Sequence, residues 1–162
     1  MTSMKYRTLG RTNFTVSALA LGTVELGMDY GIAAPGHFAR PSEAAAVTLV
    51  QATLDAGINF IDTARAYGES EAVLGKALHG RRDEVVLATK VGLHRPDGAL
   101  PTGDALRRHM LDALETSLRL LQTDYVDLWQ LHNVDGAVLA QREAITAVFD
   151  EARQSGKIRA AG

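Results

Sequence analysis

Four polar residues of this chain have side chains that could carry out acid–base chemistry together. They are a carboxylate, a phenol, an ammonium and an imidazole, at Asp62, Tyr67, Lys90 and His132. Asp62, Lys90 and His132 each follow directly after a short apolar run, and Tyr67 lies five residues after Asp62. A phenol keeps its proton at neutral pH, but it releases the proton more easily beside an ammonium group that stabilises the phenolate. This combination predicts proton transfer to or from a bound substrate.

Each of these residues also has an ordinary structural interpretation. An aspartate after a strand often forms a turn or caps a helix, and a loop tyrosine often packs its ring against apolar neighbours. A lysine in such a place commonly extends to solvent, and a lone histidine is usually a packing residue. For one residue at a time the structural interpretation is the more frequent. Four such groups predicted at one rim favour a functional site.

The segments around these residues alternate between strand-like and helical patterns. Apolar runs predict strands at residues 18–21, 58–61, 85–89 and 125–131, and another strand beginning at Ile158. Helical spacing predicts four helices: between the N-cap Ser42 and Gly57, between the N-cap Ser70 and Gly80, through residues 106–121, and over residues 138–155. Residues 25–40 form a long loop, whose Met28, Tyr30 and Phe38 supply either an apolar wall for a substrate or packing at the mouth of the fold.

The alternation predicts parallel β-α-β units with the helices outside the sheet. Residues 5–9 and 14–17, joined by the turn residues 10–13, predict a β-hairpin before these units. Two architectures fit the pattern, a doubly wound sheet and a (β/α)₈ barrel. In both, active sites are built at the carboxyl ends of the strands, where the four polar residues are expected.

Over residues 6–162 the chain resembles the aldo-keto reductase family. Five motifs carry the resemblance, in order and at suitable spacing: residues 6–12 with Val16-Ser17; residues 57–64 with Tyr67-Gly68, Ser70-Glu71 and Leu74-Gly75; Ala88-Thr89-Lys90; Ser117-Leu118 with residues 124–128 and Leu131-His132; and residues 156–159. The resemblance implies an α/β fold, a partial (β/α)₈ TIM barrel. About four to four and a half βα units, preceded by the hairpin, would make a single domain over residues 1–162.

The resemblance also implies a reaction, the reduction of aldehydes or ketones to alcohols with NADP(H), or alternatively NAD(H). Tyr67 would be the general acid and Lys90 would stabilise its phenolate, while Asp62 would pair with Lys90 and His132 would orient the carbonyl. The implied cofactor contacts at the nicotinamide end are Gly22, Thr23, Val24 and Asp62. The chain contains no G-x-G-x-x-G, in agreement with a family that binds its cofactor without a Rossmann domain.

Composition and charge indicate which partners and which location the protein is expected to have. Apolar residues make up 46% and charged residues 22% of the chain, and the net charge of −2 predicts no nucleic-acid partner. The chain has no cysteine, no signal-like start and no apolar run long enough for a bilayer, so we expect a cytoplasmic protein without membrane partners. His37, His79, His94 and His109 show no metal-ligand spacing, and we expect structural roles for Asp127 and Asp135.

Length leaves two hypotheses open. A barrel of this kind has about 250 residues, whereas the chain has 162. In the favoured hypothesis the gene product is the reductase, and these residues are its first half; the resemblance then implies that most contacts to the cofactor's pyrophosphate and adenosine come from later loops. The alternative is a non-catalytic half-barrel that self-associates through exposed sheet edges or binds a partner. In either case a small carbonyl or alcohol is the expected substrate class of the family.

Overall fold

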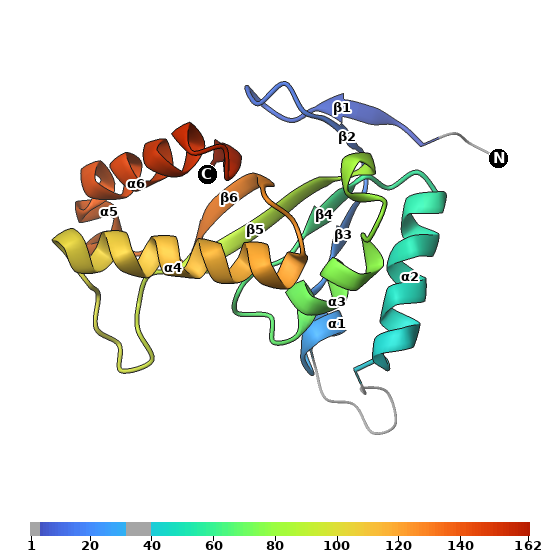
Figure 1. The fold of residues 1–162 in the computed structure, drawn as a ribbon, viewed down its shortest axis with the longest axis horizontal. Coiled ribbons are helices and arrows are strands. Elements are labelled where there is room, and N and C mark those ends of the chain that lie inside the picture. Colours follow the sequence, from blue (N-terminus) through green and yellow to red (C-terminus); the bar gives the residue numbers. More distant parts are fainter. Residues whose placement is uncertain (1–3, 32–39) are drawn as a thin grey trace.

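The chain begins with a β-hairpin, as the sequence predicts. The computed structural model describes residues 4–31 and 40–162, and the hairpin pairs β1 (Tyr6–Thr8) with β2 (Thr15–Ser17) in antiparallel register (Figure 1). Gly10 and Asn13, in the turn between these strands, have φ angles of 51° and 62°. Both are left-handed conformations that glycine and asparagine adopt more readily than other residues, which explains the turn at this place.

A five-stranded parallel sheet follows, in the order β3-β4-β5-β6-β7. The strands are β3 (Ala20–Gly22), β4 (Phe60–Asp62), β5 (Val86–Gly92), β6 (Val126–His132) and β7 (Ile158–Ala161). Their spatial order is their order along the chain. A doubly wound sheet reverses its strand order near the middle, so the structure has the singly wound order of a barrel.

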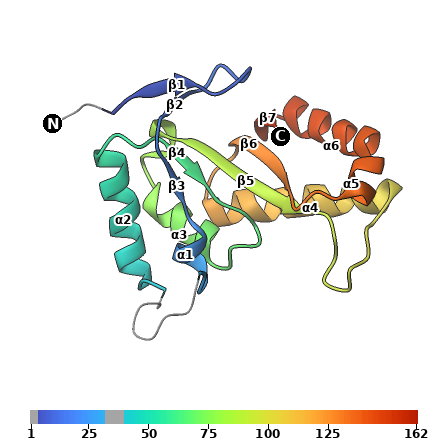
Figure 2. The same cartoon turned by 180° about the vertical axis from the view of Figure 1, so that it is seen from behind.

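The helices cover one face of this sheet (Figures 1 and 2). They are α1 (Val24–Gly27), α2 (Glu43–Asp55), α3 (Ser70–Ala77), α4 (Gly103–Leu121), α5 (Gly136–Ala140) and α6 (Arg142–Gln154), with a 3₁₀ turn η1 (Arg82–Glu84) before β5. The main core lies between sheet and helices and includes the fully buried Ile61, Leu87, Met110 and Trp129. The Trp129 ring meets the Phe149 ring of α6 edge to face, 5.1 Å between centroids. Each such side chain contributes about 1.5–3 kcal/mol of burial.

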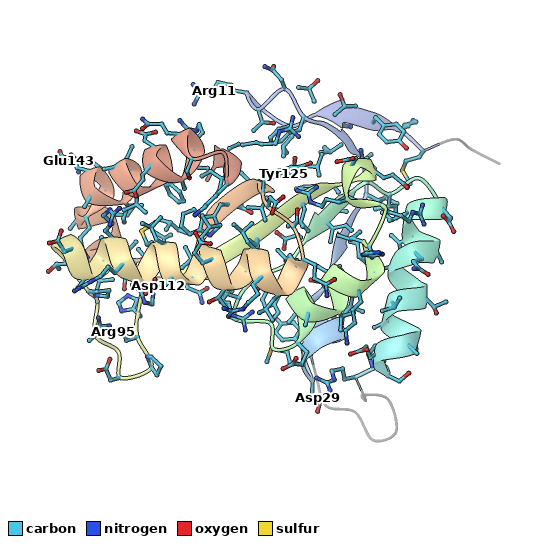
Figure 3. All side chains as sticks on the ribbon, viewed as in Figure 1. Arg11, Asp29, Arg95, Asp112, Tyr125 and Glu143 are labelled. Atoms are coloured by element: carbon cyan, nitrogen blue, oxygen red, sulfur yellow. The ribbon has the colours of Figure 1, made fainter. Side chains whose placement is uncertain are left out.

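The hairpin packs at the end of the sheet where the strands begin. Phe14 and Val16 of the hairpin form a second apolar cluster with Val86, the first residue of β5. Figure 3 labels Tyr125, just before β6, near this end, and Arg95, in the loop after β5, at the other. The hairpin therefore closes the amino end of the strands and leaves the carboxyl end open.

Several sequence predictions needed correction. Ser42 caps α2, its hydroxyl accepting from the Ala45 amide at 3.3 Å, as predicted. The prediction that Ser70 caps α3 was wrong: Glu69 occupies the N-cap position, and the Ser70 hydroxyl contacts buried threonines instead. The helix predicted over 138–155 begins earlier, because Asp135 caps α5 by accepting from the Val138 amide, and it is interrupted at Gln141, which separates α5 from α6.

The predicted loop over residues 25–40 also differs from the structure. Its first residues belong to α1, which begins directly after β3. Phe38 and His37 lie outside the described residues. Met28 and Tyr30 follow α1 and are both exposed. In the described ranges, no helix is long and apolar enough to cross a membrane.

Candidate active site

The four predicted site residues lie together at the carboxyl ends of β4, β5 and β6. Asp62 and His132 are the last residues of β4 and β6, and Tyr67 lies in the loop between β4 and α3. Lys90 was expected just after its strand, but β5 continues to Gly92. Asp62 pairs in register with Ala88. Lys90 is two residues further along β5, on the same face of the strand as Ala88. This offset lets the long lysine side chain reach across to Asp62.

The Lys90 ammonium makes three hydrogen bonds that fix its position. Its Nζ donates to Asp62 Oδ2 at 2.5 Å, to the Thr63 carbonyl at 3.0 Å and to the Tyr67 hydroxyl at 3.4 Å. The Lys90 side chain is 15% exposed and the Asp62 side chain 33%. Because the pair is partly shielded from water, it interacts more strongly than a surface pair of the same geometry. Asp62 and Lys90 therefore form one fixed unit facing the phenol of Tyr67.

His132 lies on the other side of Tyr67. The two rings are nearly perpendicular, at 87°, with their centroids 5.6 Å apart. Burial lowers the pKa of the His132 imidazole, and the nearby Lys90 charge lowers it further against the opposing effect of Asp62. This lowered pKa favours the neutral imidazole, which has one N–H donor and one acceptor nitrogen.

The loop that carries Tyr67 touches α1 backbone to backbone. The Glu69 amide donates to the Gly27 carbonyl at 3.1 Å. A Cβ added at Gly27 would collide with the Tyr67 carbonyl and the Ser70 amide, and one added at Gly68 would collide with the Gly27 carbonyl. Gly68 also has a φ of 56°. The role of Gly27, the last residue of α1, was not predicted from the sequence.

A buried cluster of three hydroxyls fastens the same loop to the sheet. Ser70 Oγ lies 2.7 Å from Thr23 Oγ1 and 3.0 Å from Thr63 Oγ1, and Thr23 Oγ1 donates to the Asp62 carbonyl at 3.0 Å. All three side chains are fully buried. Thr23, a predicted cofactor residue, is 0% exposed, and its carbonyl accepts from the Leu26 amide at 3.0 Å, so both its hydroxyl and its carbonyl bond within the protein.

A cavity of about 300 Å³ opens beside the phenol. Val24, Met28 and Tyr30 form an apolar wall, and Tyr67 and His132 supply the polar groups; Ala66 and Asn133 complete the lining. Of the predicted cofactor residues, Val24 lines this cavity, and Gly22 lies exposed at the end of β3 with open space where a Cβ would be. Asn133, which was not predicted as a site residue, adopts a left-handed φ of 58° directly after His132.

Over residues 4–31 and 40–162, no group of three or more histidine, cysteine, aspartate or glutamate side chains is placed to hold a metal ion. His94 contacts Asp135 at 2.9 Å, and Asp135 in turn accepts from the Val138 amide, so both have structural partners.

Singly wound β/α units with a polar cluster at the strand ends define a partial (β/α)₈ barrel. Residues 18–162 match the Aldo/keto reductase family, and the chain belongs to this family. It is 39% identical over 98% of its length to the aldo-keto reductase YhdN of Bacillus subtilis (strain 168), covering 46% of that protein. It is 38% identical over 97% of its length to 6-dehydroglucose reductase of Novosphingobium aromaticivorans, covering 50% of that protein.

Solved structures agree with this assignment. The holo form of an aldo-keto reductase from Bacillus halodurans superposes with a TM-score of 0.77 at 35% identity, covering 98% of this chain and 49% of that one. An aldo/keto reductase from Klebsiella pneumoniae in complex with NADP and acetate gives 0.68 at 32% identity, covering 93% of this chain and 46% of that one. The chain thus spans about half the length of the relatives it matches. The predicted family and the predicted partial barrel are confirmed.

Proposed function

We propose that this protein is an NADP(H)-dependent oxidoreductase that reduces aldehydes or ketones to alcohols, with Tyr67 as the general acid. The observation that carries the proposal is the position of Lys90, whose ammonium bonds to Asp62 and lies 3.4 Å from the Tyr67 hydroxyl. The phenol lines a cavity together with His132. A phenol at the cavity, an ammonium behind it and an imidazole beside it support this proposal.

The roles of the four residues follow from their contacts. Tyr67 gives its hydroxyl proton to the carbonyl oxygen of the substrate, and Lys90 stabilises the phenolate that remains. Asp62 holds the Lys90 ammonium in place. His132, being neutral, donates one N–H to the carbonyl oxygen and orients it. In alcohol oxidation the same phenolate accepts the proton.

The residues at the strand ends fit the reacting end of a nicotinamide cofactor. Gly22 leaves open space at the end of β3, and Val24 lines the cavity beside Tyr67. The cofactor supplies the hydride when it is bound. Val24, the exposed Gly22 and Asp62 would hold it there, with Thr23 supporting Asp62 from the interior, and the apolar wall of Val24, Met28 and Tyr30 would exclude water from the reacting carbon. The complex of the Klebsiella relative with NADP supports this choice of cofactor.

The test is an assay of the product of the complete reading frame with NADPH and a panel of small aldehydes and ketones. We expect oxidation of NADPH that depends on the carbonyl compound and yields the alcohol. Failure with every carbonyl and with both NADPH and NADH would overturn the proposal and favour the alternative, a non-catalytic fragment. The cytoplasmic location and the single domain over residues 1–162 stay predictions.

A further inference from the structure

Glu71 is a buried acid that none of the roles above uses. It is the second residue of α3, and its side chain is 0% exposed. Its Oε1 accepts a hydrogen bond from Thr89 Oγ1 at 2.7 Å, and its Oε2 pairs with the Arg65 guanidinium, whose side chain is 34% exposed. Burying a carboxylate is unfavourable unless it is paired and hydrogen-bonded. The buried Glu71 carboxylate is therefore stabilised by its bonds to Thr89 and Arg65.

Each partner of Glu71 lies next to a member of the proton-transfer pair. Thr89 directly precedes Lys90 in β5, and since neighbouring strand residues face opposite sides, Thr89 is held from the helix side while Lys90 faces the site. Arg65 lies in the loop two residues before Tyr67, and its own amide donates to the Lys90 carbonyl at 3.2 Å. Glu71 thus links the loop that carries Tyr67 to the strand that carries Lys90.

The contact between these two groups is sensitive to small movements. The distance from Lys90 Nζ to the Tyr67 hydroxyl is 3.4 Å, already longer than the usual range of about 2.7–3.2 Å. A further shift of a few tenths of an ångström would leave the two groups without a hydrogen bond. The contacts that hold the Tyr67 loop against β5 therefore control how well Lys90 can stabilise the phenolate.

We propose that Glu71, through Arg65 and Thr89, is a positioning residue that sets the distance between Tyr67 and Lys90. This inference rests on the proposed function for its effect on catalysis, but not for its effect on the loop. A merely structural ion pair would change stability alone. A positioning residue changes the proton-transfer step in molecules that remain folded.

The variant Glu71→Gln keeps the size of the side chain and removes its charge. The matched control is Glu69→Gln, which changes an exposed glutamate of the same turn. In the product of the complete reading frame we expect Glu71→Gln to lower kcat roughly tenfold to a hundredfold. KM and NADPH affinity should change by less than about threefold, because Glu71 does not line the cavity. The solvent deuterium isotope effect on kcat should rise as proton delivery becomes slower, whereas Glu69→Gln should match the unaltered protein.

Amide hydrogen exchange gives a second readout that does not depend on activity. Glu71→Gln should speed exchange of the Arg65 amide, which bonds to Lys90, by about tenfold or more, while amides in the middle of α4 keep their rates. If Glu71→Gln does not fold, Arg65→Lys replaces it; this variant keeps the charge balance but loses the guanidinium geometry, and it should show the same changes to a smaller degree.

The outcomes separate the inference from the proposed function. An unchanged isotope effect together with unchanged exchange at Arg65 would overturn the role of Glu71. Faster exchange at Arg65 in a protein that reduces no carbonyl would support the link made by Glu71 and reject the reductase. Faster exchange together with a lower kcat and a larger isotope effect supports both.

Discussion

Two carboxylates lie at opposite ends of the same sheet, and each is paired with basic side chains. At the amino end, Asp127 is 0% exposed and bonds to Arg82 at 2.8 Å, to Arg159 at 2.6 Å and to the Leu87 amide at 2.9 Å. At the carboxyl end, Asp62 is 33% exposed and bonds to Lys90. The groups around Asp127 each bond to its fully buried carboxylate, whereas the ammonium that bonds to Asp62 also reaches a phenol that lines a cavity.

The difference separates a structural network from a chemical one. The predicted structural role of Asp127 agrees with its saturated contacts, which include the guanidinium of Arg159 stacked 4.7 Å above the Phe14 ring of the hairpin. Changes at the amino end should therefore alter stability and spare the reaction. Changes at the carboxyl end should alter the reaction and spare most of the stability.

The largest expected effect is on catalysis, from Tyr67→Phe. This change removes the proton donor and keeps the ring, so carbonyl reduction should fall by roughly 100-fold or more while NADPH affinity is retained. Steady-state kinetics and NADPH fluorescence titration measure the two properties. Tyr125→Phe, at the amino end, is the control and should keep full activity; turnover of Tyr67→Phe close to that of Tyr125→Phe would remove Tyr67 from the reaction.

The second effect is on stability, from Arg82→Met at the amino end. Because Asp127 is fully buried, loss of one cation should lower the free energy of unfolding by about 3 kcal/mol, as measured by urea titration. Arg153→Met breaks an exposed pair with Asp150 and should change it by less than about 0.5 kcal/mol. Equal effects of the two variants would show that the burial of Asp127 is not what makes the network important.

A third change, Gly27→Ala, tests whether the carboxyl end also contains rigid structure. The added methyl would collide with backbone of the Tyr67 loop, so we expect a loss of about 1–3 kcal/mol together with lower activity. Gly136→Ala is the control, since a methyl there meets nothing within 4 Å and the residue begins a helix. If thermal melts show Gly27→Ala as stable as this control, the backbone contact is not tight.

The smallest effects are on the pH dependence of stability. The pKa values of two histidines at the carboxyl end are shifted in opposite directions. The Gly98 carbonyl, and then Asp135, raise the pKa of His94, so the stability this residue contributes is full below about pH 6.5 and is lost as pH rises through the folded-state pKa. Burial lowers the pKa of His132, so its contribution is full above about pH 6.5 and is lost as pH falls.

The variant His94→Gln tests the exposed member of this pair. The difference in stability between the unaltered protein and His94→Gln should be greater at about pH 6 than at about pH 8. NMR titration of the imidazole signals checks the two directions of shift directly. A His94 signal that titrates below the His132 signal would reverse the assignment.

Periodicity and turn residues predicted the hairpin, the β/α alternation and the rim on which Asp62, Tyr67, Lys90 and His132 lie. Local patterns could not choose between the two sheet architectures, because strand order is a tertiary property. They also missed the role of Ser70, whose hydroxyl bonds to Thr23, 47 positions away along the chain. The roles of Gly27 and Glu71 were missed for the same reason, since both depend on contacts between different segments of the chain.

The order of the strands has a consequence for how the molecule is made. Because each new strand is added beside the previous one, β4, β5 and β6 become neighbours in the sequence in which the ribosome releases them. All four rim residues lie on this stretch, so the ribosome has released every one of them by the time His132 emerges. Slow decoding after β6 should therefore delay the docking of β7 and not the synthesis of the rim.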